Sequence, residues 1–168
     1  MLAVLGGLLS MMALPASAQD YMGKTLWTNL TFGMTEAEVL AAQPTATKPK
    51  KPPVLPDKAV CSLELQGYNV VNRFFHACFY FTDGKLDRVI LERKTSTDGD
   101  YEDIRNQLRA KYGPEPESQS GSQLLSLAKW HGDTNTVILM LQKSLWDPRF
   151  GTIIWVYREP MPSMNDKL

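Results

Sequence analysis

The sequence is poor in the residue types that usually build a catalytic or metal centre. It has two histidines and two cysteines in 168 residues. It also contains no Gly-rich phosphate loop, no nucleophile elbow and no His-Glu-x-x-His motif. His76 and Cys78 share a face of one predicted strand but lie about 7 Å apart along it, too far for a base and its nucleophile. The sequence therefore predicts a protein that is not an enzyme and that holds no cofactor.

The sequence also lacks net charge, because 18 basic and 18 acidic side chains cancel. Proteins that bind nucleic acid or anionic membranes through general electrostatics need a basic excess. Neither class of partner is therefore expected. Beyond residue 18 the sequence has no second long apolar run, so it predicts no transmembrane helix and no stable membrane anchor in that part.

Charged residues are missing from the first 18 positions as well. Residues 1–14 form an apolar stretch that is too short to span a bilayer of ~30 Å comfortably. Pro15 then breaks the helix, and Ala16-Ser17-Ala18 supplies the small residues of a cleavage site. We therefore expect a signal peptide over residues 1–18 and a periplasmic or secreted mature protein. The alternatives are a buried N-terminal helix and an uncleaved membrane anchor.

The two cysteines are expected to form a disulfide. Export would place Cys61 and Cys78 in an oxidising compartment, where such a pair usually bridges. If residues 60–81 form a hairpin that turns near Asn69-Val70, the two cysteines lie on facing strands and close enough for an S–S bond. Two buried free thiols are the alternative.

Residue patterns predict one domain over residues 19–159. Thr35 and Glu38 fit the capping box of a short helix that ends near Ala42. Apolar residues at spacings of three and four predict a second helix, with Asp100 as its N-cap and Gly113-Pro114 as its stop. Alternating or continuous apolar runs predict six strands. Three lie within residues 60–94, and the others cover residues 124–130, 136–142 and 151–158.

Tight turns within each run of strands favour antiparallel pairing. The sequence thus predicts an α+β fold, with an antiparallel sheet of about five to six strands and two helices packed on one face. Residues 43–57 contain five prolines and predict an extended loop. Residues 115–122 predict a polar linker, and residues 160–168 a flexible tail.

The tryptophans divide between strands and loops. Trp130 and Trp155 lie on predicted strands and are expected in the core. Trp146 lies in a loop, close to Arg149 and Phe150. Because these three residue types are enriched at protein interfaces, this loop is a candidate partner contact. The alternative is a loop that folds back over the end of the sheet.

The segment Phe32-Gly33-Met34-Thr35-Glu36-Ala37-Glu38-Val39, followed by Pro44, resembles a known helix start. It is similar to the Gly-Met-Thr-x-x-x-Val pattern of small bacterial envelope proteins of the SmpA/OmlA and β-lactamase-inhibitor-protein-like types. The resemblance implies a helical segment packed on an antiparallel sheet, in a domain that works by binding another protein. The residue directly after Ala18 is Gln19 and not a cysteine, so the lipid anchor of the SmpA/OmlA lipoproteins is not expected.

The leading expectation is an exported, non-enzymatic module that binds an envelope protein or another envelope component. The binding surface would be the outer face of the sheet or the Trp146 loop. The alternative is a small-molecule or metal-binding periplasmic protein, or a hydrolase with a dispersed site. That alternative requires His76, His131 and acidic side chains to converge in one pocket. A purely structural exported protein is a third interpretation.

Overall fold

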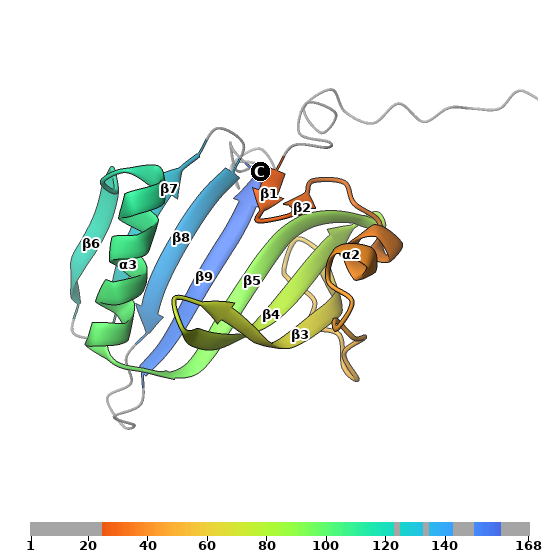
Figure 1. Ribbon diagram of the computed structural model, residues 1–168, viewed down its shortest axis with the longest axis horizontal. Coiled ribbons are helices and arrows are strands. Elements are labelled where there is room, and N and C mark those ends of the chain that lie inside the picture. The colour runs from red at the N-terminus through yellow and green to blue at the C-terminus, as the bar shows by residue number, and fades with distance from the viewer. Residues whose placement is uncertain (1–24, 123–124, 133–134, 143–149, 159–168) are drawn as a thin grey trace, which may run out of the picture.

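Two halves of the chain meet in one antiparallel sheet, and a single strand joins them (Figure 1). This computed structural model describes residues 25–122, 125–132, 135–142 and 150–158. The predicted signal peptide and the predicted tail lie outside these ranges. The described elements are, in chain order, β1 (Thr25–Trp27), β2 (Leu30–Thr31), α2 (Glu36–Ala42), β3 (Val60–Val70), β4 (Arg73–Thr82), β5 (Lys85–Ser96), α3 (Asp98–Tyr112), β6 (Glu117–Ser122), β7 (Leu125–His131), β8 (Asn135–Gln142) and β9 (Phe150–Arg158).

The main sheet has the strand order β3-β4-β5-β9-β8-β7-β6, and all neighbouring strands in it are antiparallel. Strands β1 and β2 form a separate small sheet. The predicted α+β class and the antiparallel pairing are therefore confirmed. The main sheet has seven strands rather than the five to six expected. Strand β9 lies between β5 and β8 and so joins the β3-β4-β5 meander to the β6-β7-β8 meander.

The additional strand is β6, which covers most of the segment expected to be a polar linker. Its sequence, Glu-Ser-Gln-Ser-Gly-Ser, contains no apolar residue, so no period-two pattern marks it. Its pairing with β7 runs from Glu117 opposite Lys129 to Ser122 opposite Leu125. The strand thus forms because it pairs with a neighbouring strand, and the β propensity of its own residues does not predict it.

Both helices begin with a capping box. In α2 the Thr35 hydroxyl accepts from the Glu38 amide and the Glu38 carboxylate accepts from the Thr35 amide, as predicted. In α3 the N-cap is Thr97, three residues before the expected Asp100. Asp100 is instead the N3 residue, and its carboxylate accepts from the Thr97 amide at 2.9 Å. Neither described helix is long and apolar enough to cross a membrane.

The core combines one side of the main sheet with residues of both helices. Helix α3 contributes Tyr101, Ile104 and Leu108, and α2 contributes Val39. Figure 1 shows α3 lying along β7 and β8, and close backbone contacts link it to both strands. The main-sheet members of this core cluster are Leu63, Phe75, Ala77, Phe79, Phe81, Leu86, Val89, Leu91, Ala128, Trp130, Val137, Leu139, Leu141, Ile154 and Val156.

The predicted disulfide is present and joins β3 to β4. The Cα atoms of Cys61 and Cys78 are 5.7 Å apart. The hairpin turns at Val71-Asn72, where both φ angles are positive, two residues beyond the predicted turn. A register shift next to Cys61 makes Tyr80 its backbone partner. The bridge therefore runs diagonally between the strands rather than between directly facing residues.

Residues 43–59, here called the strap, run beside β3 at the edge of the main sheet. Thr47 and Glu64 exchange two backbone hydrogen bonds of 2.8 and 2.7 Å, and the Cys61 amide donates to the Pro53 carbonyl at 2.9 Å. Because prolines lack an amide donor, the strap cannot continue the sheet as a regular strand. It nevertheless covers an edge that could otherwise pair with another chain.

Candidate functional site

The outer face of the main sheet is the side away from the core cluster. Side chains alternate along a strand, so the residues between core members point to the outer face. Backbone pairing aligns these residues in rows across the sheet. One row consists of Lys129, Ile138, Trp155, Ile90, Cys78 and Glu64. The next row consists of Leu127, Met140, Ile153, Glu92 and His76.

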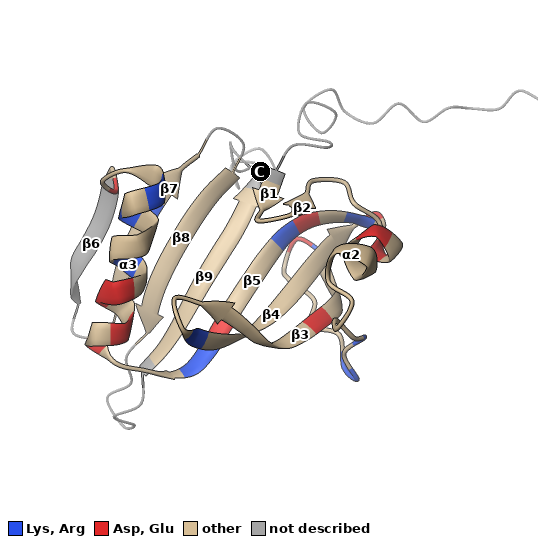
Figure 2. Ribbon diagram, in the orientation of Figure 1, with Lys and Arg blue, Asp and Glu red and all other residues tan. Residues whose placement is uncertain are grey.

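The outer face over β7, β8 and β9 is apolar. Its central residues, here called the apolar patch, are Leu127, Ile138, Met140, Ile153 and Trp155. All five are partly exposed, whereas the core residues that alternate with them are fully buried. Strand β8 contains no charged residue, and β9 contains none before Arg158. Figure 2 shows both strands without charged positions over their coloured lengths.

Phe74 adds an exposed ring at the hairpin end of β4. Its side chain is 65% exposed, while the neighbouring Phe75 is 1% exposed and belongs to the core. Phe74 therefore lies on the outer face, two residues from His76 along the strand. Apolar side chains thus flank the central polar residues of this face on both sides.

Carboxylates gather on the other half of the outer face, at β3, β5 and the adjoining strap. Four of them, here called the acidic flank, are Asp57, Glu64, Asp87 and Glu92. The Arg88 guanidinium lies 2.6 Å from Asp57 and 2.5 Å from Asp87. Asp57 and Asp87 therefore share this one guanidinium.

Glu92 is the carboxylate of the acidic flank that borders the apolar patch. It is exposed, and its backbone partner on β9 is Ile153, so about 5 Å separates the two backbones. Burial and the charge of Glu92 both raise the pKa of Tyr80. Glu64, by contrast, contacts Nε2 of His76 at 3.0 Å.

The strap forms the border of the outer face on the β3 side. Leu55 and the patch residues Ile153 and Trp155 pack against one buried cluster, which consists of Ala59, Cys61, Cys78, Tyr80 and Ile90. Burial raises the pKa of Asp57, but the hydrogen bond from the Ala59 amide and the charge of Arg88 outweigh it and lower the pKa. Asp57 therefore stays ionised and anchors the strap to β5.

The two histidines lie four strand steps apart. His76 is on β4 and His131 ends β7, with β5, β9 and β8 between them. At about 4.8 Å per step their backbones are about 19 Å apart, too far for two ligands that each bind Zn²⁺ at about 2 Å. Nδ1 of His131 lies 3.4 Å from the Thr136 hydroxyl. The described residues contain no group of three or more His, Cys, Asp or Glu side chains that could hold a metal ion.

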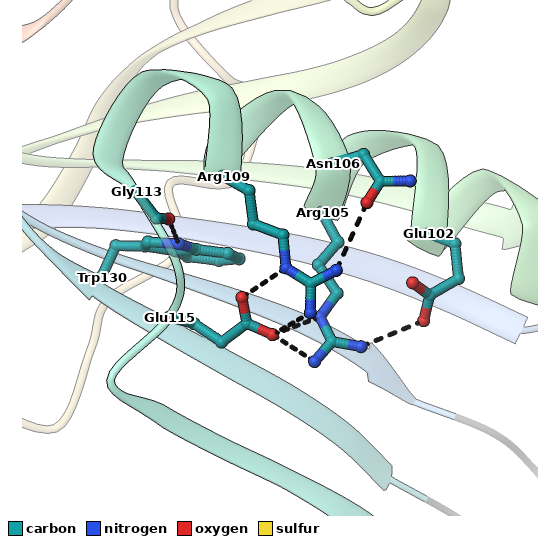
Figure 3. Close-up of polar contacts among 7 residues, drawn as sticks. All are labelled: Glu102, Arg105, Asn106, Arg109, Gly113, Glu115 and Trp130. Carbon is teal, nitrogen blue, oxygen red and sulfur yellow. Dashed lines mark hydrogen bonds and ion pairs between the residues drawn. The ribbon is translucent and has the colours of Figure 1, made fainter.

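Two arginines of α3 hold the carboxylate of Glu115, just beyond the end of the helix (Figure 3). Nε of Arg105 and Nε of Arg109 lie 2.7 and 2.6 Å from its oxygens. The Glu115 side chain is 5% exposed. The hydrogen bond from Arg109 is the main reason why the pKa of Glu115 is lowered to about 2. These groups satisfy one another, so the cluster stabilises the connection from α3 to β6.

A second charged cluster ties the β3–β4 hairpin to the start of α3. Arg73 places Nε 2.6 Å from Asp100 and Nη2 2.6 Å from Asp103. Arg93 of β5 approaches the same Asp100 at 3.0 Å. Burial raises the pKa of Asp100, but hydrogen bonds from Arg73 and Thr97 outweigh it and lower the pKa to about 2. The acidic first turn of α3 therefore has arginine partners from two strands.

Acid is expected to destabilise the fold through these two clusters. Glu115 and Asp100 have a pKa of about 2 in the folded protein, against ordinary values of 4.5 and 3.8. The unfolded chain therefore binds more protons as the pH falls from about 5 towards 2, and stability is lost in that window. We expect a loss of about 2 kcal/mol after solvent screening. Urea unfolding at a series of pH values measures it. Glu115→Gln should flatten the dependence, and an unchanged slope in this variant would contradict the assignment.

The structure brings together only part of the predicted site. The Cys61–Cys78 disulfide is confirmed, but Trp146 and Arg149 lie outside the described residues. Phe150 begins β9, where its backbone partner is Ser96. The outer face was hidden in the sequence because β8 and β9 are apolar on both sides. An alternation between apolar and polar residues would have separated the two faces, and these strands do not have one.

The resemblance to envelope proteins rests on residues 32–39, which include the N-cap and the first turn of α2. The structure shows a capping box there, which is a local device for beginning a helix. No protein-family model, curated protein or solved structure was found to match the chain.

Proposed function

We propose that the chain is an exported, non-enzymatic domain that binds a protein partner of the bacterial envelope through the outer face of its sheet. In this arrangement both helices cover the opposite face. The observation that carries the proposal is the apolar patch, whose five residues on three adjacent strands are all partly exposed. Contiguous apolar surface on a folded protein usually marks an interaction site. Methionine and tryptophan, both present in the patch, are enriched at interfaces.

The chemistry of the described residues supports binding rather than catalysis. The sulfur of Cys78 is bonded to Cys61, so it supplies no thiolate nucleophile. In the described structure His76 contacts the Glu64 carboxylate and not a hydroxyl or thiol. A base without a nucleophile or an activated water does not make a hydrolytic site.

The disulfide supports the export part of the proposal, because the cytosol keeps most thiols reduced. The periplasmic compartment and the signal peptide over residues 1–18 are proposed from the sequence. The loop that contains Trp146 and Arg149 remains a second candidate contact, proposed on its composition. A partner that spans the outer face of β8 and β9 would approach the end of β8, where this loop begins.

Site-directed photo-crosslinking in cells that produce the full chain tests the docking face. A photoreactive residue at Met140, in the patch, is expected to give an adduct with one partner protein. The same residue at Gln107, which is exposed on α3, serves as the matched control and should give none. The Met140 adduct should be lost when Ile153→Asp is added, provided that the variant keeps its disulfide and its circular dichroism spectrum. Adducts that form equally at both positions, or at neither, would refute the docking face.

A further inference from the structure

Resting on the proposed function, we infer that the partner presents a basic amphipathic helix. The helix lays its apolar side on the apolar patch and directs lysine or arginine side chains to the acidic flank. Three properties of the outer face support this occupant. They are the saturation of the sheet backbone, the dimensions of the patch and the sign of the charge beside it.

The backbone of the patch favours a helix over an extended segment. Strands β7, β8 and β9 each have a paired neighbour on both sides, so their backbone donors and acceptors are used within the sheet. A segment that lies on this face must therefore satisfy its own backbone groups, and a helix does so internally. The patch spans three strands, or about 10 Å between the outer two, which matches the width of one helix.

The charge of the acidic flank favours a partner with positively charged side chains. Asp57 and Asp87 already pair with Arg88, and Glu64 contacts His76. Glu92 is exposed and makes no hydrogen bond or ion pair with any described residue. A helix on the patch would remove Glu92 from water, which is costly unless a cation accompanies it. A lysine or arginine at the edge of the helix supplies that cation, whereas an acidic partner would be repelled.

The strap borders the outer face and limits how the bound helix can be oriented. Leu55 packs against the same buried cluster as Ile153 and Trp155, so the strap and the patch border this cluster together. Its Asp57 is anchored to Arg88 by a 2.6 Å ion pair. The strap carries Lys48, Lys50, Lys51 and Lys58 beside Asp57, so the negative charge next to the patch is that of Glu92 on β5. The basic residues of a helix seated on β8 and β9 are therefore expected along its β5 side.

Two synthetic helical peptides of about 18 residues test the inference. One has leucine on one side and lysine on the other, and the second has glutamate in place of lysine. The purified exported protein is titrated with each peptide and followed by two-dimensional NMR. We expect shifts at β7, β8, β9 and Glu92 with the lysine peptide, and at least tenfold weaker binding of the glutamate peptide. Glu92→Lys should weaken the lysine peptide at least tenfold, and Glu92→Gln by a smaller factor. The matched control Glu102→Lys, which makes the same charge change on exposed α3, should leave affinity within twofold.

Equal affinity for the two peptides, or equal effects of Glu92→Lys and Glu102→Lys, would overturn the inference. So would a self-association of the protein that Met140→Asp abolishes, because the patch would then be filled by a second copy. Preferential binding of the patch to anionic phospholipid vesicles would overturn it as well. The Met140 adduct tests the docking face itself, so an adduct that persists when Glu92→Lys has no effect leaves the proposed function intact and removes only the basic helix.

Discussion

Replacing Trp130 with alanine is expected to lower the free energy of unfolding by about 3–5 kcal/mol. Trp130 has the largest fully buried side chain of the described protein. Its indole Nε1 donates a 3.0 Å hydrogen bond to the Gly113 carbonyl at the end of α3 (Figure 3). The substitution therefore leaves a cavity between helix and sheet and takes the donor from that carbonyl. Urea unfolding followed by far-ultraviolet circular dichroism measures the loss.

Trp155 provides the matched control for this substitution. It has the same side chain on a strand of the same sheet, but it lies partly exposed on the outer face. Trp155→Ala is therefore expected to cost about 1–2 kcal/mol, because less apolar area returns to water. Trp130→Phe isolates the hydrogen bond and should cost about 1–2 kcal/mol. Equal losses for the two alanine variants would show that the inner and outer faces are wrongly assigned.

Replacing both Cys61 and Cys78 with alanine is expected to lower the free energy of unfolding by about 3 kcal/mol. The bridge joins residues 17 positions apart, and a closed loop of this length restricts the unfolded chain by about that amount. The two residues are 0% and 5% exposed, so a reductant should reach the sulfurs mainly in molecules that have opened. The bridge also holds β4 to β3, the strand that the strap runs beside.

Unfolding with and without reductant checks the effect of the disulfide. The wild-type curve in reductant should move towards that of the double alanine variant, and the variant curve should not move at all. A thiol-reactive probe added to the denatured, unreduced wild type should leave both cysteines unlabelled. Stoichiometric labelling under those conditions would contradict the bridge.

The features that could be predicted from the sequence depend on short stretches of chain. The capping box of α2 needs only Thr35 and Glu38, and the structure has it. The disulfide could be predicted because Cys61 has one possible partner in the chain. The N-cap of α3 is Thr97 rather than the predicted Asp100, because threonine and aspartate are both favoured at an N-cap and the sequence alone does not choose between them. The mutual hydrogen bonds of Thr97 and Asp100 fix the start of the helix at Thr97.

The features that could not be predicted depend on distant residues. Strand β6 exists through its pairing with β7 and has no apolar pattern of its own. Trp155 was expected in the core because β9 is apolar on both sides, and strand order alone decides which side is covered. The hydrogen bonds from Arg105 and Arg109 to Glu115 could not be predicted either. A glutamate just after the end of a helix does not indicate that arginines of that helix contact it.

The central position of β9 has a consequence for the order of events when the protein is made. Strands β5 and β8 each lack one neighbour until residues 150–158 are available. A chain that leaves the ribosome, or a narrow translocation pore, N-terminus first would therefore carry the first meander alone until β8 is complete, and the two meanders would stay separate until β9 follows. Such a chain cannot complete its fold early, so it can still pass through a pore. Until β9 arrives, however, the unpaired edges of β5 and β8 are prone to aggregation. Release of the final strand ends that exposure and completes folding in one late step.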